Sequence, residues 1–176
     1  MQLLEQANAF YQKVKPDQNI FLSVQMRTIM NLIKMGQSEK AIEELQVLIK
    51  RFPEGALLHM TLGDAYRNME DYKNALSAYE KATQLANPLD PQIASLYFYQ
   101  GVCLELMGDL NGASEFFDKA LKIDSENPIY LNYAGYTLLE QNKDIPRALS
   151  LIEKAVVKMP KDGNVLDSLG WAYYLM

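Results

Sequence analysis

The sequence has almost none of the residues that build reactive or metal-binding centres. Its 176 residues include one cysteine, Cys103, and one histidine, His59. A single cysteine excludes an intramolecular disulfide, and one histidine with one cysteine is too few for a catalytic triad or a zinc site. A glycine-rich phosphate loop, a paired-histidine motif and a calcium-binding loop are also missing from the sequence. We therefore expect a protein that is not an enzyme and needs no cofactor or metal, with His59 and Cys103 as packing residues.

Basic runs and long apolar runs are missing as well. The chain has 17 Lys and Arg against 22 Asp and Glu, which gives a net charge of −5. An acidic chain without a basic patch is a poor binder of nucleic acid or of an anionic membrane surface. The most apolar stretch, residues 96–107, is shorter than the ~20 residues of a membrane-spanning helix. Residues 1–11 carry no signal-peptide pattern. We expect a soluble protein, and the sequence leaves its compartment open: the cytoplasm, or the periplasm if the N-terminus has been trimmed.

What the sequence does contain is an internal repeat. A glycine followed by two alanines recurs along the chain with spacings of 34 to 38 residues between copies. The three copies are Gly63, Ala75 and Ala82, then Gly101, Ala113 and Ala120, then Gly135, Ala148 and Ala155. A fourth copy upstream has Ala41 and carries Ile29 where the glycine belongs. A fixed period of this length is typical of proteins built from stacked repeats.

Each repeat reads as two amphipathic helices. Apolar residues recur at positions 4, 7, 8 and 11 and again at 20, 24 and 27, which are single faces of two helices with a period of 3.6. Gly36 and Gly108 stand where a first helix should end, and prolines such as Pro53 and Pro128 stand between hairpins. We expect the repeated glycines to lie opposite the first alanine of each copy, so that the paired helices approach closely.

These landmarks resemble the tetratricopeptide repeat, whose pattern of about 34 residues runs W-x2-L-G-x2-Y, A-x3-F and P. The resemblance implies an all-α fold, an α-solenoid of antiparallel helix hairpins wound into a right-handed superhelix, with about ten helices. Four full repeats fit residues 22–55, 56–93, 94–127 and 128–162, and a fifth begins over residues 163–176. The second repeat carries a small insertion around Asn87–Pro91.

The two ends look like single helices of incomplete repeats. Residues 2–15 form one amphipathic segment before Pro16-Asp17, so we expect residues 1–21 to be an orphan capping helix and a linker. At the other end, Tyr174 and Met176 place apolar side chains where a terminal repeat normally has a polar outer face. We expect the chain to be part of a longer array. The alternatives are that these side chains cover an internal gap or that the last helix is a natural cap.

The resemblance also implies a partner-binding groove, because positions 2, 5, 9, 12 and 13 of the first helices face a ligand in the family. The residues implied are Met26, Met30, Met60, Asp64, Arg67, Phe98, Val102, Asn132, Tyr136, Asp167 and Trp171. Methionine adapts its shape and aromatic rings supply contact area, so the groove suits an apolar segment of a protein or peptide. Its carboxylates favour a partner that is partly basic. The alternative for the apolar positions is that they pack in the core.

Two further patterns bear on function. Some tetratricopeptide domains hold the terminal carboxylate of a chaperone with lysine and asparagine, but this chain has Met26, Met30 and Thr61 among those positions. Residues 131–174 resemble a bacterial subfamily whose members are often exported or outer-membrane-associated scaffolds. We expect a non-catalytic protein–protein interaction scaffold. The alternatives are a structural module that acts through self-association of its repeat ends, and a regulatory part of a larger protein.

Overall fold

The computed structural model describes residues 2–15 and 20–176, which form ten α-helices and no strand. In chain order the helices are α1 (Gln2–Tyr11), α2 (Phe21–Lys34), α3 (Ser38–Arg51), α4 (Ala56–Asn68), α5 (Tyr72–Leu85), α6 (Ile93–Leu106), α7 (Leu110–Ile123), α8 (Pro128–Glu140), α9 (Ile145–Lys158) and α10 (Gly163–Leu175). The predicted all-α fold and number of helices are confirmed. Within the described ranges, no helix combines the length and apolar character needed to cross a membrane.

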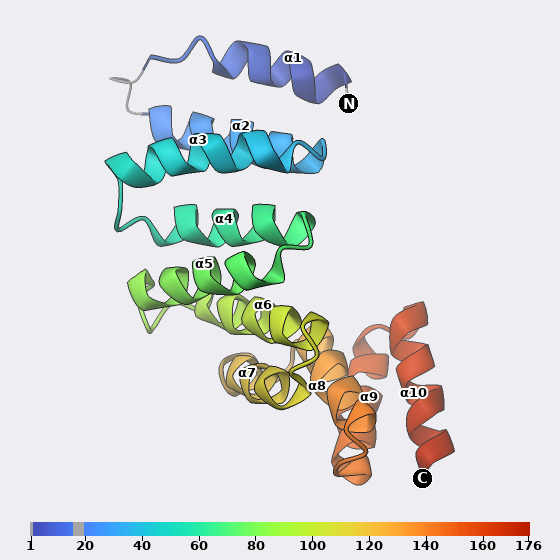
Figure 1. The fold of residues 1–176 in the computed structure, drawn as a ribbon. Helices are drawn as coiled ribbons and strands as arrows, with labels where there is room; N and C mark the ends of the chain where they lie inside the picture. Colours follow the sequence, from blue (N-terminus) through green and yellow to red (C-terminus); the bar gives the residue numbers. More distant parts are fainter. Residues whose placement is uncertain (1, 16–19) are drawn as a thin grey trace. The chain divides into compact units, whose positions relative to one another are not determined.

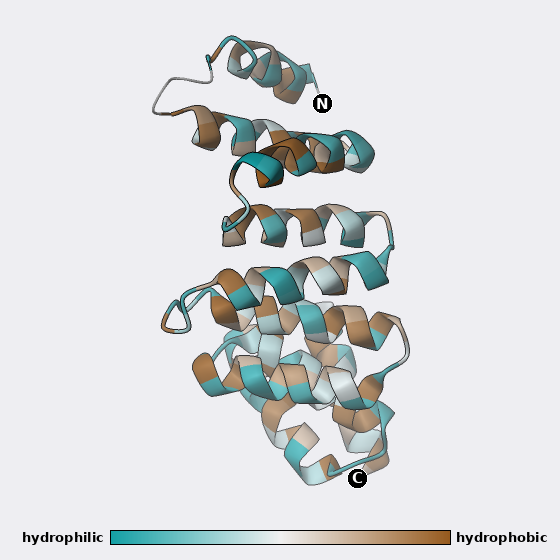
Figure 2. Cartoon of the chain, turned by 60° about the vertical axis from the view of Figure 1, so that its left-hand side comes forward, coloured by the Kyte–Doolittle hydropathy of each residue, from teal (hydrophilic) through white to brown (hydrophobic). Residues whose placement is uncertain are grey.

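The chain divides into two compact units, residues 1–85 and residues 86–176. In the first unit α2 pairs with α3 and α4 with α5, while α1 packs on α2 (Figure 1). In the second unit α6 pairs with α7 and α8 with α9, and α10 packs on both α8 and α9. Apolar and polar residues alternate along the helical ribbons (Figure 2), as the periodicity requires when only one face of a helix is buried. Each unit is therefore a short stack of helix hairpins.

The four hairpins lie where the sequence places four full repeats, and α10 occupies residues 163–175. At the N-terminus the predicted helix over residues 2–15 is too long, because α1 ends at Tyr11. The backbone N–H of Lys13 donates to the carbonyl oxygen of Phe10, an i to i−3 hydrogen bond that tightens the last turn and ends the helix. Residues 16–19 of the expected linker lie outside the described residues.

The turn inside each hairpin has a left-handed residue just after the first helix, and the turn between α8 and α9 has a second one, Asp144, with φ of 41°. Gly36 and Gly108 have φ of 72° and 86°, as expected for glycines that end a helix. The same place in the other two hairpins holds Glu70 and Asn142, with φ of 60° and 51°. In all four turns the N–H of the following residue donates to a carbonyl five residues earlier, at 2.9–3.0 Å. The backbone motif is thus kept even where the glycine is not.

The atom nearest to each repeated glycine belongs to a bulky side chain rather than to the expected alanine, although at Gly135 the carbonyl oxygen of Ala148 is also close, 3.0 Å from an added Cβ atom. A Cβ atom added to any of them would lie 2.5–2.6 Å from a bulky side chain of the second helix. The pairs are Gly63 with Tyr79, Gly101 with Phe117, and Gly135 with Ile152. The bulky residue lies one helical turn beyond the expected alanine, and it fills the space that the missing side chain leaves. In the first hairpin Ile29 occupies the glycine position and Leu45 the position of the bulky residue, and both side chains are fully buried.

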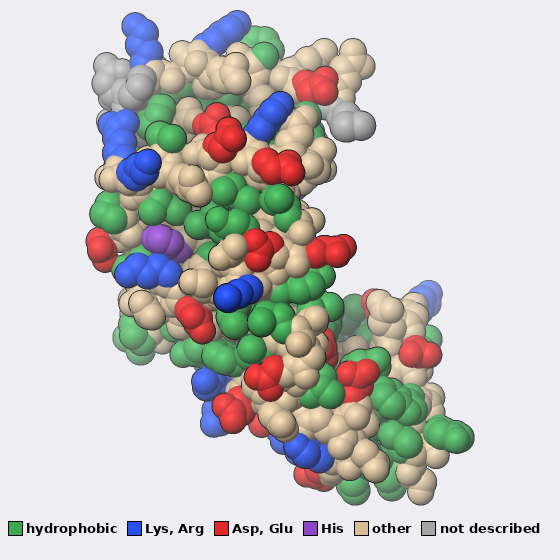
Figure 3. Space-filling model, viewed as in Figure 1, with side chains coloured by type: hydrophobic (Ala, Val, Ile, Leu, Met, Phe, Trp, Pro, Cys, Tyr) green, Lys and Arg blue, Asp and Glu red, His purple; other side chains and the backbone are tan. Residues whose placement is uncertain are grey.

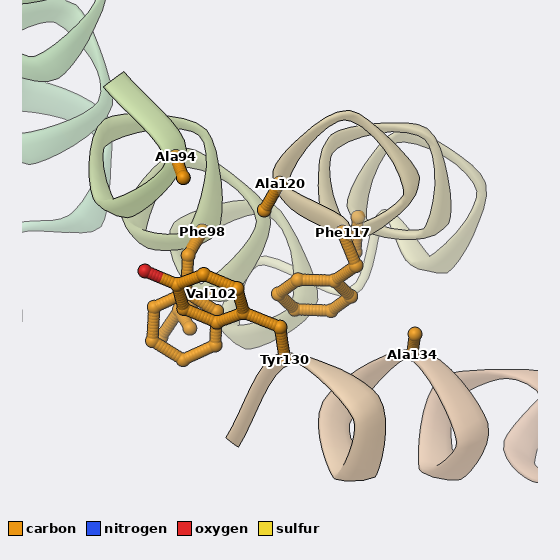
Figure 4. Close-up of a cluster of buried hydrophobic side chains, with 8 residues drawn as sticks. Ala94, Phe98, Val102, Phe117, Ala120, Tyr130 and Ala134 are labelled. Atoms are coloured by element: carbon orange, nitrogen blue, oxygen red, sulfur yellow. The ribbon is translucent and has the colours of Figure 1, made fainter. Parts of the chain in front are cut away.

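Aromatic side chains dominate the core of the second unit. The Phe98 ring of α6 lies 5.8 Å from that of Phe117 in α7 and 4.9 Å from that of Tyr130 in α8. The three rings point toward one another between the helices, with small residues such as Ala120 beside them (Figure 4). Contacts of this kind join the first hairpin of the unit to the second. They fix the spacing between α6 and α8, and so the width of the surface between them.

Candidate functional site

Each unit has a pocket lined by first helices of its hairpins alone. In the second unit the pocket has a volume of about 380 Å³ and is lined by residues of α6, α8 and α10. These residues are Glu105, Asn132, Tyr133, Tyr136, Asn164, Asp167 and Ser168. Three predicted groove residues, Asn132, Tyr136 and Asp167, therefore meet at one place. The second helices α7 and α9 contribute nothing to it.

The pocket of the first unit has a different chemical character. It has a volume of about 210 Å³ between α2 and α4, and its lining is mostly apolar. The lining residues are Met30, Ile33, Lys34, Leu57, Met60, Thr61 and Asp64. Met30 is 49% exposed and Leu57 is 57% exposed, so both offer apolar surface that packing leaves uncovered. The predicted residues Met30, Met60 and Asp64 meet here.

Glu105 is a largely buried carboxylate of the second-unit pocket. Burial raises its pKa, the hydrogen bond from the Thr137 hydroxyl opposes that shift, and the negative charge of Glu140 adds to it. The Thr137 Oγ1 to Glu105 Oε1 distance is 2.9 Å, and the same hydroxyl also lies 2.8 Å from the Tyr133 carbonyl oxygen. One hydroxyl hydrogen is shared between two acceptors, so Glu105 is only partly compensated.

The aromatic side of this pocket is formed by Tyr136 and its neighbours. The Tyr136 hydroxyl donates to Glu140 Oε1 at 3.2 Å, and its ring centroid lies 5.3 Å from that of Trp171 in an edge-to-face contact. Partial burial raises the pKa of Tyr136, and the charges of Glu140, Glu105 and Asp167 raise it further. Trp171 thus stands beside the pocket, packed on one of its lining residues.

In the first unit, Asp64 and Arg67 contact each other and the second helix. The Tyr79 hydroxyl donates to Asp64 Oδ1 at 2.7 Å, and Arg67 Nε donates to the Tyr79 hydroxyl oxygen at 3.2 Å. Burial raises the pKa of Asp64, while the Tyr79 hydrogen bond and the Arg67 charge lower it. Arg67 is not among the residues that line the pocket. Its role is to hold Asp64 and Tyr79 in place.

Three predicted groove residues are core residues instead. Met26, Phe98 and Val102 are only 7%, 8% and 9% exposed. Met26 packs with Ile29 and its neighbours in the first unit, and Phe98 and Val102 belong to the aromatic cluster of the second. The family positions place them on the inner side of a first helix, but the next first helix covers them. Their expected exposure to a ligand is wrong.

Four residues that the repeat pattern did not single out also line the pockets. Tyr133, Asn164 and Ser168 belong to the second-unit pocket, and Leu57 belongs to that of the first. Asn164 is position 2 of the fifth repeat, so the family rule applied to α10 would have found it. Tyr133 and Ser168 lie next to ligand-facing positions, and no signal in the sequence separates them from ordinary packing residues.

A third cavity lies beside α1, away from the two first-helix pockets. It has a volume of about 710 Å³ and separates α1 from α2 and α3. Its lining mixes Lys40 with Glu5, Glu43 and Glu44. Asn8 of α1, one of the lining residues, accepts a hydrogen bond at its Oδ1 atom from Asn31 Nδ2 of α2, at 3.0 Å. The cavity therefore shows that α1 leaves part of the surface of α2 and α3 uncovered.

The described residues bring no reactive constellation together. Cys103 is fully buried, and His59 Nε2 lies 3.2 Å from the carbonyl oxygen of Pro53, where it hydrogen-bonds to the backbone. In the part of the chain that the structure describes, no three of His, Cys, Asp and Glu are grouped so that they would hold a metal ion. What the two pockets present is surface for contact rather than groups for chemistry.

Comparison with family models gives a continuous match over much of the chain. A tetratricopeptide repeat model matches residues 55–126, and a second tetratricopeptide repeat model matches residues 23–55. Together they cover residues 23–126, more than half of the sequence. The matches begin near α2 and end after α7, so both units contain recognised repeats.

A curated relative extends the likeness to most of the chain. The TPR repeat-containing protein PA4667 of Pseudomonas aeruginosa is 27% identical over 165 residues, which is 93% of this chain. The chain spans 27% of the length of that relative. The sequence is therefore similar to one part of a considerably longer bacterial protein.

Solved structures share the fold at low sequence identity. MamA matches with a TM-score of 0.75 and 20% identity over 90% of both chains. TTC0263, a thermophilic TPR protein from Thermus thermophilus, matches with a TM-score of 0.70 and 20% identity over 97% of this chain and 91% of its own. YrrB, described as a TPR protein with an unusual peptide-binding site, matches with a TM-score of 0.71 and 16% identity over 97% of this chain and 82% of its own. With the family models, the sequence relative and the fold in agreement, the chain belongs to the tetratricopeptide repeat family.

Proposed function

We propose that the chain is a non-catalytic scaffold that binds a segment of a partner protein along the first helices of its hairpins. The tetratricopeptide fold supports a protein–protein interaction module, and the pockets support this choice of surface. One observation carries the proposal. In both units the pocket between successive first helices is lined by side chains that the hairpin packing leaves in part uncovered.

The first-unit pocket suits an apolar side chain of the partner. Met30 and Leu57 are about half exposed, and the flexible methionines at positions 30 and 60 adapt to the shape of an inserted group. Burial of apolar surface contributes about 25 cal/mol per Å², so one leucine-sized side chain contributes about 2 kcal/mol. Asp64 also lines the pocket, and its hydrogen bond from the Tyr79 hydroxyl fixes the position of its carboxylate.

The absence of catalysis is part of the same proposal. An enzyme would need a nucleophile, an acid or a base near an open cavity, and Cys103 is fully buried away from either pocket lining. Asp64 and Glu105, the pocket carboxylates whose pKa burial raises, each accept a hydrogen bond from a hydroxyl group, of Tyr79 and Thr137 respectively. YrrB, whose description names a peptide-binding site, has the same fold and supports a binding role.

The test is selection from a display library of random linear peptides on the immobilised full-length chain. Peptides enriched on the wild type are then measured by fluorescence anisotropy against Met30→Glu in the first unit and Asp167→Ala in the second. We expect at least one of these variants to lose most of the binding. Val47→Glu and Val157→Glu serve as matched controls, because both side chains are exposed, at 67% and 81%, on second helices.

Two results would count against the proposal. Enriched peptides that bind Met30→Glu and Asp167→Ala as well as the wild type, but lose binding to a control variant, would place the contact on the second helices. A selection without any enriched peptide would remove the evidence for segment binding. Far-UV circular dichroism of every variant separates loss of binding from loss of folding.

The exposed side chains at the C-terminal end of α10 support a second candidate function, self-association. Tyr173, Tyr174 and Met176 are 55%, 85% and 67% exposed, and hydrophobic side chains protrude over this helix (Figure 3). A Cβ atom added to Gly170 would meet nothing within 4 Å, whereas the same position in the other hairpins is filled by a second helix. Sedimentation over a range of concentrations tests this function. A dimer that Tyr174→Glu abolishes would support it, and a monomer at all concentrations would refute it.

A further inference from the structure

The pocket of the second unit is acidic and has no basic residue in its lining. Glu105 comes from α6 and Asp167 from α10, on opposite sides, and Glu140 of α8 acts on Glu105 through its charge. Ion pairs elsewhere in this unit join Arg147 to Asp118 and Lys158 to Glu126, so they do not neutralise the pocket. An acidic recess of this kind attracts a cation.

A second, independent feature points to a missing hydrogen-bond donor. Asn132 is only 8% exposed and lines the pocket, and its Oδ1 atom is buried without a hydrogen-bond partner. A buried acceptor without a protein donor is unfavourable, because it forgoes a hydrogen bond that it makes in the unfolded chain. Buried polar side-chain atoms are in large majority paired, so this unpaired acceptor, on a side chain that lines the pocket, would gain a partner if Asn132 turned toward a donor bound there.

The aromatic side of the pocket suits the same kind of ligand. Tyr133 and Tyr136 line it, and Tyr136 is held by its hydrogen bond to Glu140 and by its contact with Trp171. A cation near an aromatic face gains about 0.5–2 kcal/mol beyond its ion pairs. The volume of about 380 Å³ is large enough for a long side chain and too small for a folded element.

We propose that this pocket binds the cationic side chain of an arginine or lysine carried by the partner segment, with Glu105, Asp167 and Asn132 Oδ1 as its acceptors. The inference rests on the proposed function, which it deepens by naming the chemistry that the second unit recognises. A metal ion fits the site less well, because the acidic residues described here do not form a group of metal ligands. A guanidinium or ammonium group has several donors that reach separated acceptors.

The electrostatics of Glu105 agree with this assignment. Burial raises its pKa and the nearby Glu140 raises it further, so the negative charge of Glu105 is unfavourable in this environment. A cation seated between Glu105 and Asp167 stabilises the charged form of both. Binding of a cation therefore offsets part of the unfavourable free energy of the buried Glu105 charge.

The test uses Trp171, the one tryptophan of the chain, as a reporter beside the pocket. The probes are N-acetyl-arginine amide and N-acetyl-lysine amide, titrated into the full chain and followed by tryptophan fluorescence and by the NMR signals of the Trp171 indole and the Asn132 amide. N-acetyl-citrulline amide, which has nearly the shape of the arginine probe but no charge, is the matched ligand control.

Two variants complete the design. Glu105→Gln removes the buried charge, and Glu115→Gln makes the same change at an exposed position of α7. We expect the cationic probes to shift both NMR signals, the citrulline probe to shift neither, and Glu105→Gln to weaken binding about tenfold or more while Glu115→Gln leaves it unchanged. Loss of one charged hydrogen bond of about 1.5–3 kcal/mol corresponds to that factor.

The possible outcomes separate this inference from the proposed function. Absence of binding by the cationic probes, equal binding of citrulline, or an unchanged affinity of Glu105→Gln would overturn the cationic site. If peptides from the display library bind the first helices without an arginine or lysine, the proposed function stands and the cationic site fails. If the probes bind as expected but no peptide is enriched, the cationic site stands and segment binding fails.

Discussion

The close contact between each repeated glycine and a bulky side chain gives the sharpest prediction about this fold. Replacing Gly101 with alanine adds a Cβ atom 2.6 Å from Cε1 of Phe117. Two carbon atoms prefer a separation of about 3.5–4.0 Å, so one of them has to move. Phe117 has little freedom to do so, because it is fully buried and its ring lies 5.8 Å from Phe98 and 5.6 Å from Tyr133.

The expected magnitude is the difference between two opposing effects. Alanine favours a helix by about 1 kcal/mol relative to glycine. Overpacking of a rigid core costs about 1–3 kcal/mol, and a buried aromatic ring places this site at the upper end. We expect Gly101→Ala to lower the free energy of unfolding by about 1–2 kcal/mol. Gly170→Ala is the matched control, because its Cβ atom meets nothing, and it should leave stability unchanged or raise it by up to about 1 kcal/mol.

Urea unfolding followed by Trp171 fluorescence is a suitable assay, because this tryptophan reports on the second unit, where both glycines lie. A double variant, Gly101→Ala with Phe117→Leu, should cost less than the sum of the two single changes, since the smaller side chain makes room for the new methyl group. The first hairpin already uses this solution, with Ile29 and Leu45 buried together. If Gly101→Ala were as stable as Gly170→Ala, the reasoning on close packing would be refuted.

Three other predictions concern the turns, the pocket and the core. At the left-handed turn position, Glu70→Gly should stabilise the protein by about 1 kcal/mol, and Gly36→Ala should destabilise it by a similar amount. Urea unfolding measures both changes, and a stabilising Gly36→Ala would contradict the assignment of the turn. Because the pKa of Glu105 is raised above its usual 4.5, the stability that its protonated form gives is present below that pH and is lost as the pH rises through the raised pKa. Glu105→Gln should therefore resist urea better than the wild type at neutral pH, with the gap closing toward pH ~4, and equal midpoints at neutral pH would argue against burial of the charge. Phe98→Ala should lower the free energy of unfolding by about 3–5 kcal/mol and Tyr136→Ala by less than about 1 kcal/mol. Thermal or urea unfolding measures both, and the reverse order would contradict the assignment of Phe98 to the core.

Much of the fold could be predicted from the sequence because its elements are local. Helical periodicity of apolar residues, glycine at the turn and proline between hairpins act over a few residues, so the helix pairs followed from spacing alone. Where the local signal is weak, the predicted helix end was wrong: α1 ends at Tyr11 rather than at Lys15. Glu70 and Asn142 also occupy left-handed turn positions without being glycines, and only the hydrogen bonds of the turn reveal them.

The candidate site was predicted less well, because exposure of a first-helix side chain depends on the next helix. Tyr136 and Phe98 both stand on the inner side of a first helix in the sequence pattern, yet Tyr136 lines a pocket and Phe98 is covered by α8. The unpaired Oδ1 atom of Asn132 is likewise visible only when all its neighbours are placed. No spacing rule distinguishes a covered position from an open one.

The sequence by itself determined the repeat, the helix pairs, the acidic character of the chain and the family. The tertiary structure decided which side chain fills the space at each glycine, which predicted groove residues are core, and that the acceptors of the second-unit pocket come from three different helices. The physical reason is range. Helix formation and turns depend on residues a few positions apart, whereas pockets and burial depend on residues that only stacking of the hairpins brings together.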